Sequence, residues 1–386
     1  AAFGGEIKEE DIPRWRSVFD LDRLIWAFDG ELPVATAAAH TFQLTVPGGE
    51  LPAAGVTFVG VLPSHRRRGI LRQLMRHQLD DVRGRGEPLA ILWASEAPIY
   101  GRFGYGLAAR AMFMDAERSS VSFRAPSRPT GSVRLVPLEE AGGVLPDIYD
   151  RVRRETPGMF GRTEAWWSAL RLADPEHERR GGGPLFCSVI DLDGSPEAYA
   201  LYRLEGSWEG GIPRGKLQIR EALGTTPEAT REIWRFLFGV DLVERVKGWA
   251  LPVDHPLQLM LADTRRLHLT VGDGLWLRLV DLPAALRARS YAEHASLVLG
   301  VDDAFCEWNT GTWRLDVAAA GAEVTRANGE PDLRLTIEDL ASTYLGAFTF
   351  ADLARAGRVE ETTEGAIARA DELFRTSRAP WCPEVF

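Results

Sequence analysis

The chain has 386 residues, of which 45% are hydrophobic and 26% charged, and its formal net charge is −10. This length exceeds what one ordinary hydrophobic core supports and predicts two or three globular domains. The acidic balance excludes bulk electrostatic attraction to nucleic acid, so a site for an anionic ligand has to be built locally.

The first third of the chain alternates strands with helices. The β-branched run 55–62 predicts a buried strand, and the apolar residues of 70–84 recur with helical spacing. Residues 87–95 predict a second buried strand. Beyond it we expect a short helix or turn interrupted by glycines at 97–106, and another strand at 108–118.

A polar segment with two prolines, 119–132, is typical of a linker between domains. Strands and helices alternate from there to the end, which predicts an α+β or α/β fold class. One hairpin is expected to turn at Asp193-Gly194. The other expected strands are 132–138, 215–224, 274–282, 296–303, 312–317 and 333–337. The expected helices are 148–154, 163–172, 227–239, 283–291, 338–346 and 349–357.

One strand–helix unit occurs twice. The unit at 55–83 has a counterpart at 215–238, in which GTTPEATR replaces SHRRRGIL. If the two units share an ancestor, the second has lost its positively charged turn. Only the first unit is therefore expected to bind an anion.

Three consecutive arginines, Arg66, Arg67 and Arg68, stand at the junction of the first strand and its helix. A helix N-terminus attracts anions, guanidinium groups suit phosphate oxygens, and Gly69 allows a close backbone approach. The pattern G-x-x-x-x-G-K-[ST] is absent from the sequence, so hydrolysis of ATP or GTP is not indicated. A solvated basic turn is the plainer alternative, and the buried strands and amphipathic helix around the arginines count against it.

The residues at this junction carry a family resemblance. The pattern R/Q-x-x-G-x-G/A between a strand and a helix is the coenzyme A pyrophosphate loop of the GNAT acyltransferases, and the chain matches it except at Leu71. The stretches VGVLPSHRRRGIL (59–71) and ASEAPIYGRFGYG (94–106) closely resemble the Eis (enhanced intracellular survival) family of N-acetyltransferases. A looser likeness at 273–291 and 343–347 extends the resemblance over the whole chain.

The resemblance implies an α+β chain of three domains: an acetyl-CoA-binding GNAT domain at 1–127, a degenerate GNAT domain at 128–282 and a sterol-carrier-like domain at 283–386. It implies that acetyl-CoA binds in the first domain alone, which agrees with the single arginine turn. Strand backbone would hold the pantetheine arm, and the arginine turn the pyrophosphate. The expected coenzyme-binding residues are Val59, Gly60, Val61, Arg66, Arg67, Arg68, Gly69, Ile70, Leu71 and Ser95.

Acetyl transfer from a thioester to an amine requires the amine to lose a proton, and the departing thiolate benefits from gaining one. The resemblance implies that Tyr100 is the general acid and that the C-terminal carboxylate, carried by Phe386, is the general base. Glu384 is an alternative carboxylate. Without the resemblance, the tyrosine would be assigned to core packing and the last residue to a frayed terminus.

The acceptor has to be a cation, which predicts an acidic and aromatic pocket. By similarity to the family pocket, its candidate residues are Phe3, Trp15, Trp93 and Glu384, with Glu6 and Asp20 as further sources of charge. The first strand of the family and most of its first helix are expected to precede Ala1. The resemblance implies acetylation of aminoglycosides at several amines.

The other chemistry-bearing residues indicate no further site. Cys187, Cys306 and Cys382 are odd in number and widely spaced, which disfavours a disulfide framework or zinc cluster and favours the reducing cytoplasm. His177 lacks metal-ligand spacing, so no metal is expected, and His65 is expected to be a turn residue. No apolar run reaches membrane-spanning length, so no membrane partner is expected.

Two alternatives to an amine N-acetyltransferase remain open. A non-catalytic binding protein would hold a lipid or a partner in its sterol-carrier-like domain, which predicts a long apolar tunnel within 283–386. A protein-lysine acetyltransferase would differ only in its acceptor and would need an open groove. The resemblance also implies a homo-oligomer, which is a hexamer in the family.

Overall fold

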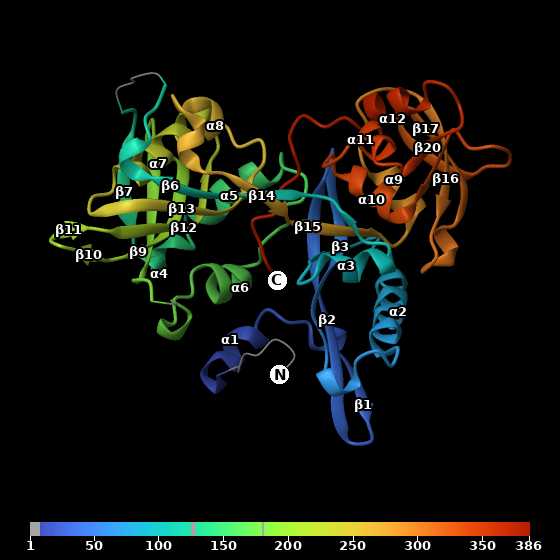
Figure 1. Cartoon of the computed structure of the whole chain (residues 1–386), viewed down its shortest axis with the longest axis horizontal. Helices are drawn as coiled ribbons and strands as arrows, with labels where there is room; N and C mark the ends of the chain where they lie inside the picture. The colour runs from blue at the N-terminus through green and yellow to red at the C-terminus, as the bar shows by residue number, and fades with distance from the viewer. Residues whose placement is uncertain (1–7, 125–128, 180) are drawn as a thin grey trace. The chain divides into compact units, whose positions relative to one another are not determined.

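The computed structural model describes residues 8–124, 129–179 and 181–386 and contains two compact units (Figure 1). Unit 1 consists of residues 1–110, 156–161 and 273–386, and unit 2 of residues 111–155 and 162–272. Each unit is built around mixed β-sheets with helices packed on them, which confirms the α+β fold class.

The first sheet of unit 1 has the strand order β1-β2-β3-β4-β15-β5. Strands β1, β2 and β3 form an antiparallel meander, and β4 runs parallel to β3. The sequence did not indicate β1 or the long strand β2. Four of the ten buried positions of β2 are alanine, which has little strand preference. The strands are β1 (Ile25–Asp29), β2 (Leu32–Val46), β3 (Gly49–Val61), β4 (Leu89–Trp93), β5 (Gly106–Leu107) and β15 (Leu275–Leu279).

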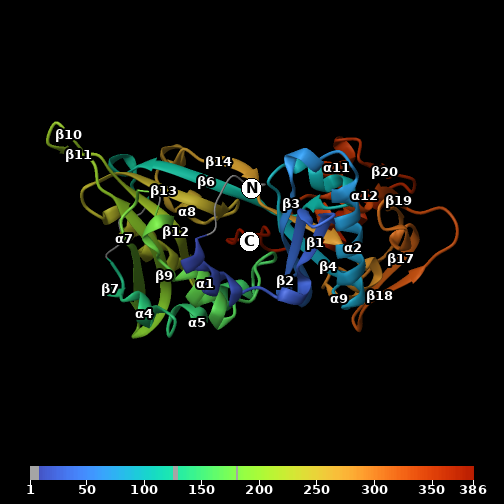
Figure 2. The same ribbon diagram turned by 90° about the horizontal axis from the view of Figure 1, so that it is seen from below.

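Helix α2 (Ile70–Gly84) covers one face of this sheet, as Figures 1 and 2 show. Its apolar residues Met75, Leu79 and Val82 are completely buried and pack on strand residues such as Ala54 and Ala90. The helix predicted from the apolar spacing is therefore confirmed. The other helices of this region are short: η1 (Glu9–Asp11), α1 (Ile12–Arg16), η2 (Leu21–Arg23), η3 (Pro63–His65), α3 (Ala97–Tyr100) and η4 (Gly101–Phe103).

Two strands are exchanged between the regions that the resemblance predicts to be the two GNAT domains. Strand β15 lies between β4 and β5 in the first sheet, although it follows the second region in sequence. Strand β6 (Arg110–Glu117) belongs to the sheet of unit 2, where it pairs with β13. The predicted domains at 1–127 and 128–282 are continuous stretches and do not include this exchange, because a sequence pattern indicates a strand but not its partner in the sheet.

The sheet of unit 2 has the order β14-β6-β13-β12-β9-β8-β7. The hairpin of β8 and β9 turns at Asp193 (φ 51°) and Gly194 (φ 80°), which confirms the predicted turn. The strands are β7 (Ser132–Val136), β8 (Leu185–Leu192), β9 (Ser195–Glu205), β10 (Trp208–Glu209), β11 (Ile212–Pro213), β12 (Gly215–Gly224), β13 (Val243–Pro252) and β14 (Thr270–Asp273). The helices are η5 (Arg118–Ser120), α4 (Leu138–Ala141), α5 (Leu145–Arg153), α6 (Glu164–Trp166), η6 (Trp167–Arg171), η7 (Glu176–Glu178), α7 (Pro227–Gly239), α8 (Leu257–Met260) and η8 (Thr264–Leu267).

The repeat predicted from the sequence is present in both units. Strands β12 and β13 are parallel and joined by α7, as β3 and β4 are parallel and joined by α2. At the start of α7 the Thr226 side chain accepts the N–H of Ala229 at 3.1 Å, so the helix caps itself. Helix α2 starts at Gly69 (φ 83°) without a side-chain cap. No side chain of this kind occupies the N-terminal donors of α2, whereas one donor of α7 is already used.

The sterol-carrier-like region of unit 1 has its own sheet, with the order β18-β17-β16-β19-β20. Its interior residues Leu297, Leu299, Leu315, Leu333 and Leu340 are completely buried. These side chains form a core within the region, which also contains a cavity of about 340 Å³ lined by residues such as Phe348, Phe350 and Phe374. Its elements are α9 (Leu282–Ala288), β16 (Ser296–Asp302), η9 (Glu307–Asn309), β17 (Gly311–Ala318), β18 (Gly321–Arg326), β19 (Leu333–Thr336), α10 (Ile337–Tyr344), α11 (Phe350–Arg355), β20 (Val359–Glu361) and α12 (Ala366–Phe374).

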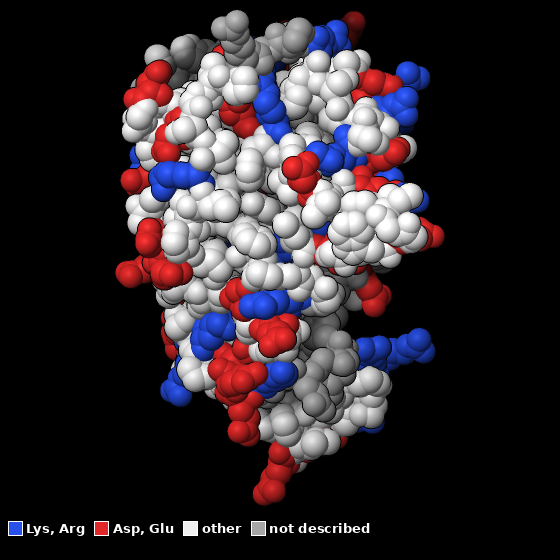
Figure 3. All heavy atoms as spheres, turned by 90° about the vertical axis from the view of Figure 1, so that its left-hand side faces the viewer, with Lys and Arg blue, Asp and Glu red and all other residues white. Residues whose placement is uncertain are grey.

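Charge is mixed on the face drawn in Figure 3. Basic and acidic residues alternate there around uncharged areas, and the basic residues do not join into a continuous patch on that face. Within the described part of the chain, none of the helices combines the length and apolarity needed to span a membrane.

Candidate functional site

A cavity of about 540 Å³ opens in unit 1 where β3, α2, β4 and α3 meet. It combines apolar side chains with four exposed arginines, the combination that a ligand with an anionic and an apolar part requires. Its lining residues are Val59, Gly60, Val61, His65, Arg66, Arg67, Gly69, Ile70, Leu71, Arg72, Ser95, Glu96, Ile99, Tyr100, Arg102 and Phe103.

The cavity exists because β3 and β4 part from one another. They pair in parallel only as far as Gly55 opposite Ile91. Beyond that point β3 contains an irregularity at Phe58, whose φ is 51° and whose carbonyl accepts a hydrogen bond from Thr36 Oγ1 at 2.8 Å. A bulge of this kind re-aims the strand. The lining begins at the next residue, Val59.

The turn between β3 and α2 forms the cationic end of the cavity. Gly69 has a φ of 83°, and a Cβ placed on it would meet no atom within 4 Å. The turn therefore leaves open space in front of the α2 N-terminus, where a diphosphate group fits. Arg67 also has a positive φ, 64°, which is unfavourable for a residue with a side chain and typical of functional loops.

The structure separates the three arginines that the sequence grouped together. Arg66 and Arg67 line the cavity, whereas Arg68 is not among its lining residues. The Arg68 guanidinium lies 3.8 Å from the carboxylate of Asp29 at the end of β1. The other residues expected to bind the coenzyme all lie on the lining. Sequence reasoning missed Arg72, Arg102 and Phe103, because the loop pattern does not extend to them.

Tyr100 also lines the cavity. It ends α3, only 6% of its surface is exposed, and its ring centroid lies 5.9 Å from that of Tyr105. Burial raises the pKa of the Tyr100 phenol, and a hydrogen bond with the Ser95 side chain partly opposes the rise. The phenol therefore keeps its proton at neutral pH and is equipped to act as an acid.

The glycines that follow Tyr100 leave space for residues of β15 and α10. A Cβ at Gly104 would overlap the guanidinium of Arg278, and one at Gly106 the backbone of Glu338 in α10. Arg278 is completely buried, donates to the Gly104 carbonyl at 3.3 Å and forms an ion pair with Asp303. The glycines of the RFGYG motif therefore let the sterol-carrier-like region support the segment that carries Tyr100.

The sterol-carrier-like region also packs on helix α2. The Phe305 ring lies 4.4 Å from the guanidinium carbon of Arg76 and 5.0 Å from the centroid of Phe103. Trp308 lies 4.5 Å from the guanidinium carbon of Arg83. Cation–π contacts of this kind stabilise by about 0.5–1 kcal/mol each at exposed sites. Helix α2 is therefore held from its outer side as well as by the sheet.

A second group of aromatic residues extends from the bulge of β3 to the last residue. We call it the aromatic cluster, and its members are Trp15, Phe19, His40, Phe42, Phe58, Phe160 and Phe386. The Phe19 centroid lies 5.0 Å from that of Phe58 and 4.6 Å from that of His40. The cluster offers ring faces that suit a cation.

Only two members of this cluster, Trp15 and Phe386, were predicted. His40 and Phe42 gave a signal that could have been used, because their alternate positions on β2 place both side chains on one face of the sheet. Phe19, Phe58 and Phe160 come from separate segments, and no local pattern connects them.

The side chain of Phe386 packs against other aromatic rings. The Phe386 centroid lies 5.1 Å from that of Phe42 and 5.6 Å from that of Phe160. Residues 380–384 before it are buried although they form no regular secondary structure, and Glu384 is 2% exposed. The side chain of Phe386 is therefore held by its contacts with Phe42 and Phe160.

The remaining candidates for the acceptor pocket differ in their surroundings. Trp93 ends β4 and is half-buried, and its indole N–H finds no hydrogen-bond acceptor among the described residues. Asp20 is exposed and accepts a hydrogen bond from Thr41 at 2.9 Å. Phe3 and Glu6 lie outside the described residues.

Acid is expected to destabilise the chain through His40. Burial lowers the pKa of His40 to about 4, although the hydrogen bond from Nδ1 to the Val18 carbonyl opposes this. The unfolded chain has a histidine pKa of about 6.5. The stabilisation is therefore complete above pH 6.5 and is lost as the pH falls toward 4, by about 3 kcal/mol in total.

Urea unfolding at pH 7.5 and pH 4.5 measures this loss. His40→Gln should lose less stability on acidification than the unsubstituted chain. His255 of unit 2 is the matched comparison, since burial lowers its pKa to about 4 as well. Identical pH dependence with and without His40 would contradict the assignment.

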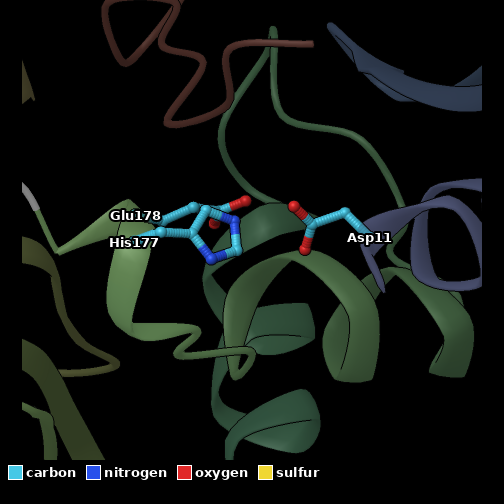
Figure 4. Close-up of side chains that lie close together, drawn as sticks. All are labelled: Asp11, His177 and Glu178. Carbon is cyan, nitrogen blue, oxygen red and sulfur yellow. The ribbon is translucent and has the colours of Figure 1, made fainter. Parts of the chain in front are cut away.

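No metal site follows from the acidic residues and histidines. Figure 4 draws Asp11, which belongs to unit 1, with His177 and Glu178, which are exposed neighbours in η7 of unit 2. Because the three side chains come from different units, they carry no argument for a shared ion.

Comparisons with known proteins agree with the architecture. Acetyltransferase (GNAT) domain models match residues 1–108 and 158–279, and a sterol carrier protein domain model matches residues 282–383. An uncharacterised N-acetyltransferase of Streptomyces avermitilis is 41% identical over 390 residues, covering 100% of this chain and 95% of the relative.

Eis proteins match nearly from end to end. The N-acetyltransferase Eis of Mycobacterium tuberculosis is 34% identical over 387 residues, covering 97% of this chain and 92% of the relative. The crystal structure of Eis1 from Mycobacterium abscessus has a TM-score of 0.85 at 32% identity, covering 100% of this chain and 95% of that one. With two GNAT domains, a sterol carrier domain and these relatives, the chain belongs to the Eis family of GNAT N-acetyltransferases.

Proposed function

We propose that this enzyme transfers the acetyl group of acetyl-CoA to small cationic amines, including aminoglycosides, at several amine positions. The observation that carries the proposal is the cavity, whose lining contains Arg66, Arg67 and Gly69 together with the buried Tyr100. The aromatic cluster supports a cationic acceptor, because ring faces attract ammonium groups. The GNAT fold itself uses acyl-CoA as the donor.

The proposed reaction is a direct transfer. The carboxylate of Phe386 removes a proton from the substrate ammonium, and the neutral amine then attacks the thioester carbonyl. A C–N bond forms, the C–S bond breaks, and Tyr100 delivers its proton to the departing sulfur. The nitrogen then releases its second proton, which restores the phenol of Tyr100 and leaves a neutral amide. The raised pKa of Tyr100 supports this role, since the phenol is protonated when the thiolate leaves.

Donor binding is assigned to the residues of the cavity. Backbone groups of Val59 and Val61 would hold the pantetheine arm, and the turn from Arg66 to Leu71 would hold the pyrophosphate. Ser95 lies beside Tyr100, at the acetyl end. Arg68 is left out of this assignment because it faces Asp29.

The test measures thiol release from acetyl-CoA with a panel of aminoglycosides, polyamines and lysine peptides. Mass spectrometry of the products gives the number of acetyl groups transferred. Arg66→Ala should raise the dissociation constant of coenzyme A about tenfold, the size expected for a charge-assisted hydrogen bond. The matched control Arg68→Ala should change it less than about twofold.

Each outcome of this test separates two hypotheses. Multiple acetyl groups on an aminoglycoside support the proposal, and acetylation restricted to lysine peptides indicates a protein acetyltransferase. Intact coenzyme A binding without release on any amine would favour the non-catalytic binding protein. Equal weakening by Arg66→Ala and Arg68→Ala would overturn the assignment of the anion site.

We also propose that the chain forms a homo-oligomer, which the family resemblance makes a hexamer, in the cytoplasm. Edge strand β1 exposes 52% of Trp26 and 60% of Phe28, and large apolar residues on a sheet edge are typical of interaction surfaces. The three cysteines are free thiols, as a reducing compartment favours. Light scattering measures the oligomeric state.

A further inference from the structure

The short segment 157–161 lies beside β2. It is part of the unit 1 stretch Thr156–Gly161, and the chain on both sides of that stretch belongs to unit 2. The Thr45 N–H donates to the Met159 carbonyl at 2.7 Å, and the Gly158 N–H donates to the Thr45 carbonyl at 2.8 Å. Gly161 donates to Gln43 at 3.0 Å. The segment thus occupies the edge of β2 beyond Ala37, where β1 has ended.

The other side of this segment contacts the C-terminal tail. The Trp381 N–H donates to the Pro157 carbonyl at 2.8 Å. Gly158 has a φ of 95°, and a Cβ on it would lie 2.9–3.2 Å from backbone atoms of Trp381. Such a separation is too short for a side chain, so only glycine lets the tail approach this closely. One segment therefore binds both the sheet and the tail.

Phe160 extends this contact to the last residue. Its ring stacks on that of Phe42 with centroids 3.9 Å apart and an angle of 14° between the planes. The Phe386 ring meets both edge-on, at 76° to Phe42 and 81° to Phe160, a favourable arrangement for aromatic rings. Phe42 can take its position because its partner strand carries Gly55 beneath the ring, where any side chain would overlap it.

We propose that Gly158 and Phe160 are positioning residues for the C-terminal carboxylate in acetyl transfer. The inference rests on the proposed function of that carboxylate as the base. A chain terminus is mobile unless it is tied down, and a base has to stay within hydrogen-bond reach of the amine. The segment 157–161 supplies the tie, through one backbone hydrogen bond and one ring contact.

The test uses the full chain with Phe160→Ala and, separately, Gly158→Ala. In both, kcat should fall about tenfold to a hundredfold, the effect of a misplacement of about 1 Å. The dissociation constant of coenzyme A should stay within about twofold, because neither residue lines the coenzyme cavity. Carboxypeptidase should release Phe386 faster than from the unsubstituted chain. Phe160→Leu, which keeps an apolar contact, should restore most of kcat.

Gly329→Ala is the matched control. Gly329 has a φ of 97°, nearly that of Gly158, but a Cβ on it would meet no atom within 4 Å. The Gly329→Ala substitution therefore introduces the same backbone strain without contacting the C-terminal tail. Its kcat and its rate of Phe386 release should equal those of the unsubstituted chain.

A chain with one glycine added after Phe386 distinguishes failure of this inference from failure of the proposed function. If that chain acetylates normally, the terminal carboxylate is not the base, whatever the Phe160 variants do. If the added glycine abolishes the rate while Phe160→Ala and Gly158→Ala keep both kcat and resistance to carboxypeptidase, the base stands and the positioning role is overturned.

Discussion

Replacing Tyr100 by Phe is expected to lower kcat by about 10²–10³-fold while coenzyme A binds within about twofold of its normal affinity. The substitution removes only the hydroxyl, and the buried ring keeps its contact with Tyr105. Without the phenolic proton the sulfur has to leave as an unprotonated thiolate. Because burial raises the pKa of Tyr100, its ionisation is not expected to reduce the rate below pH 10. Steady-state kinetics and calorimetric titration measure the two quantities.

Tyr105→Phe is the matched control for this prediction. Tyr105 lies in the same motif, is completely buried and carries a hydroxyl that has no hydrogen-bond partner among the described residues. It does not line the cavity. Its loss should leave kcat within about threefold. A normal rate in Tyr100→Phe, or an equal loss in both variants, would show that the phenol of Tyr100 is not the acid.

Local patterns predicted those parts of the fold that depend on neighbouring residues. The apolar spacing of α2, the strand before it and the turn at Asp193-Gly194 are confirmed, because periodicity and turn chemistry act over a few residues. The exchange of β6 and β15 was not predicted, since the choice of sheet partner is made by packing over long sequence distances. Strand β2 was missed in part because four of its ten buried residues are alanine, which carries little strand preference.

The site divides in the same way. The residues from Val59 to Leu71 form one continuous segment, from the end of β3 to the start of α2. A short motif was therefore enough to place them at a cavity. The aromatic cluster joins segments near 15–19, 40–42 and 160 with the last residue, and no motif spans them. Arg68 lies 3.8 Å from Asp29 and outside the cavity lining, and its predicted contact with the coenzyme stays a prediction.

The C-terminal carboxylate is the second group whose removal should have a large effect. Its proposed role is tested most directly by changing its charge without changing its length. Cys382 allows this, because a peptide Cys-Pro-Glu-Val-Phe can be ligated to a chain that ends at Trp381. Ligation of the peptide with a C-terminal carboxamide gives a neutral terminus. Ligation of the same peptide as the free acid gives a control that has passed through the same preparation.

The carboxamide is expected to lower kcat by at least about 10²-fold, since general-base catalysis contributes about 10²–10⁴-fold. The dissociation constant of coenzyme A should not change, because Phe386 lies outside the cavity lining. The melting temperature should stay the same, because the rings of Phe386, Phe42 and Phe160 keep their contacts. Full activity of the carboxamide would transfer the role of base to another group, and Glu384→Gln, which removes the charge of the buried carboxylate two residues away, would then be the variant that loses the rate.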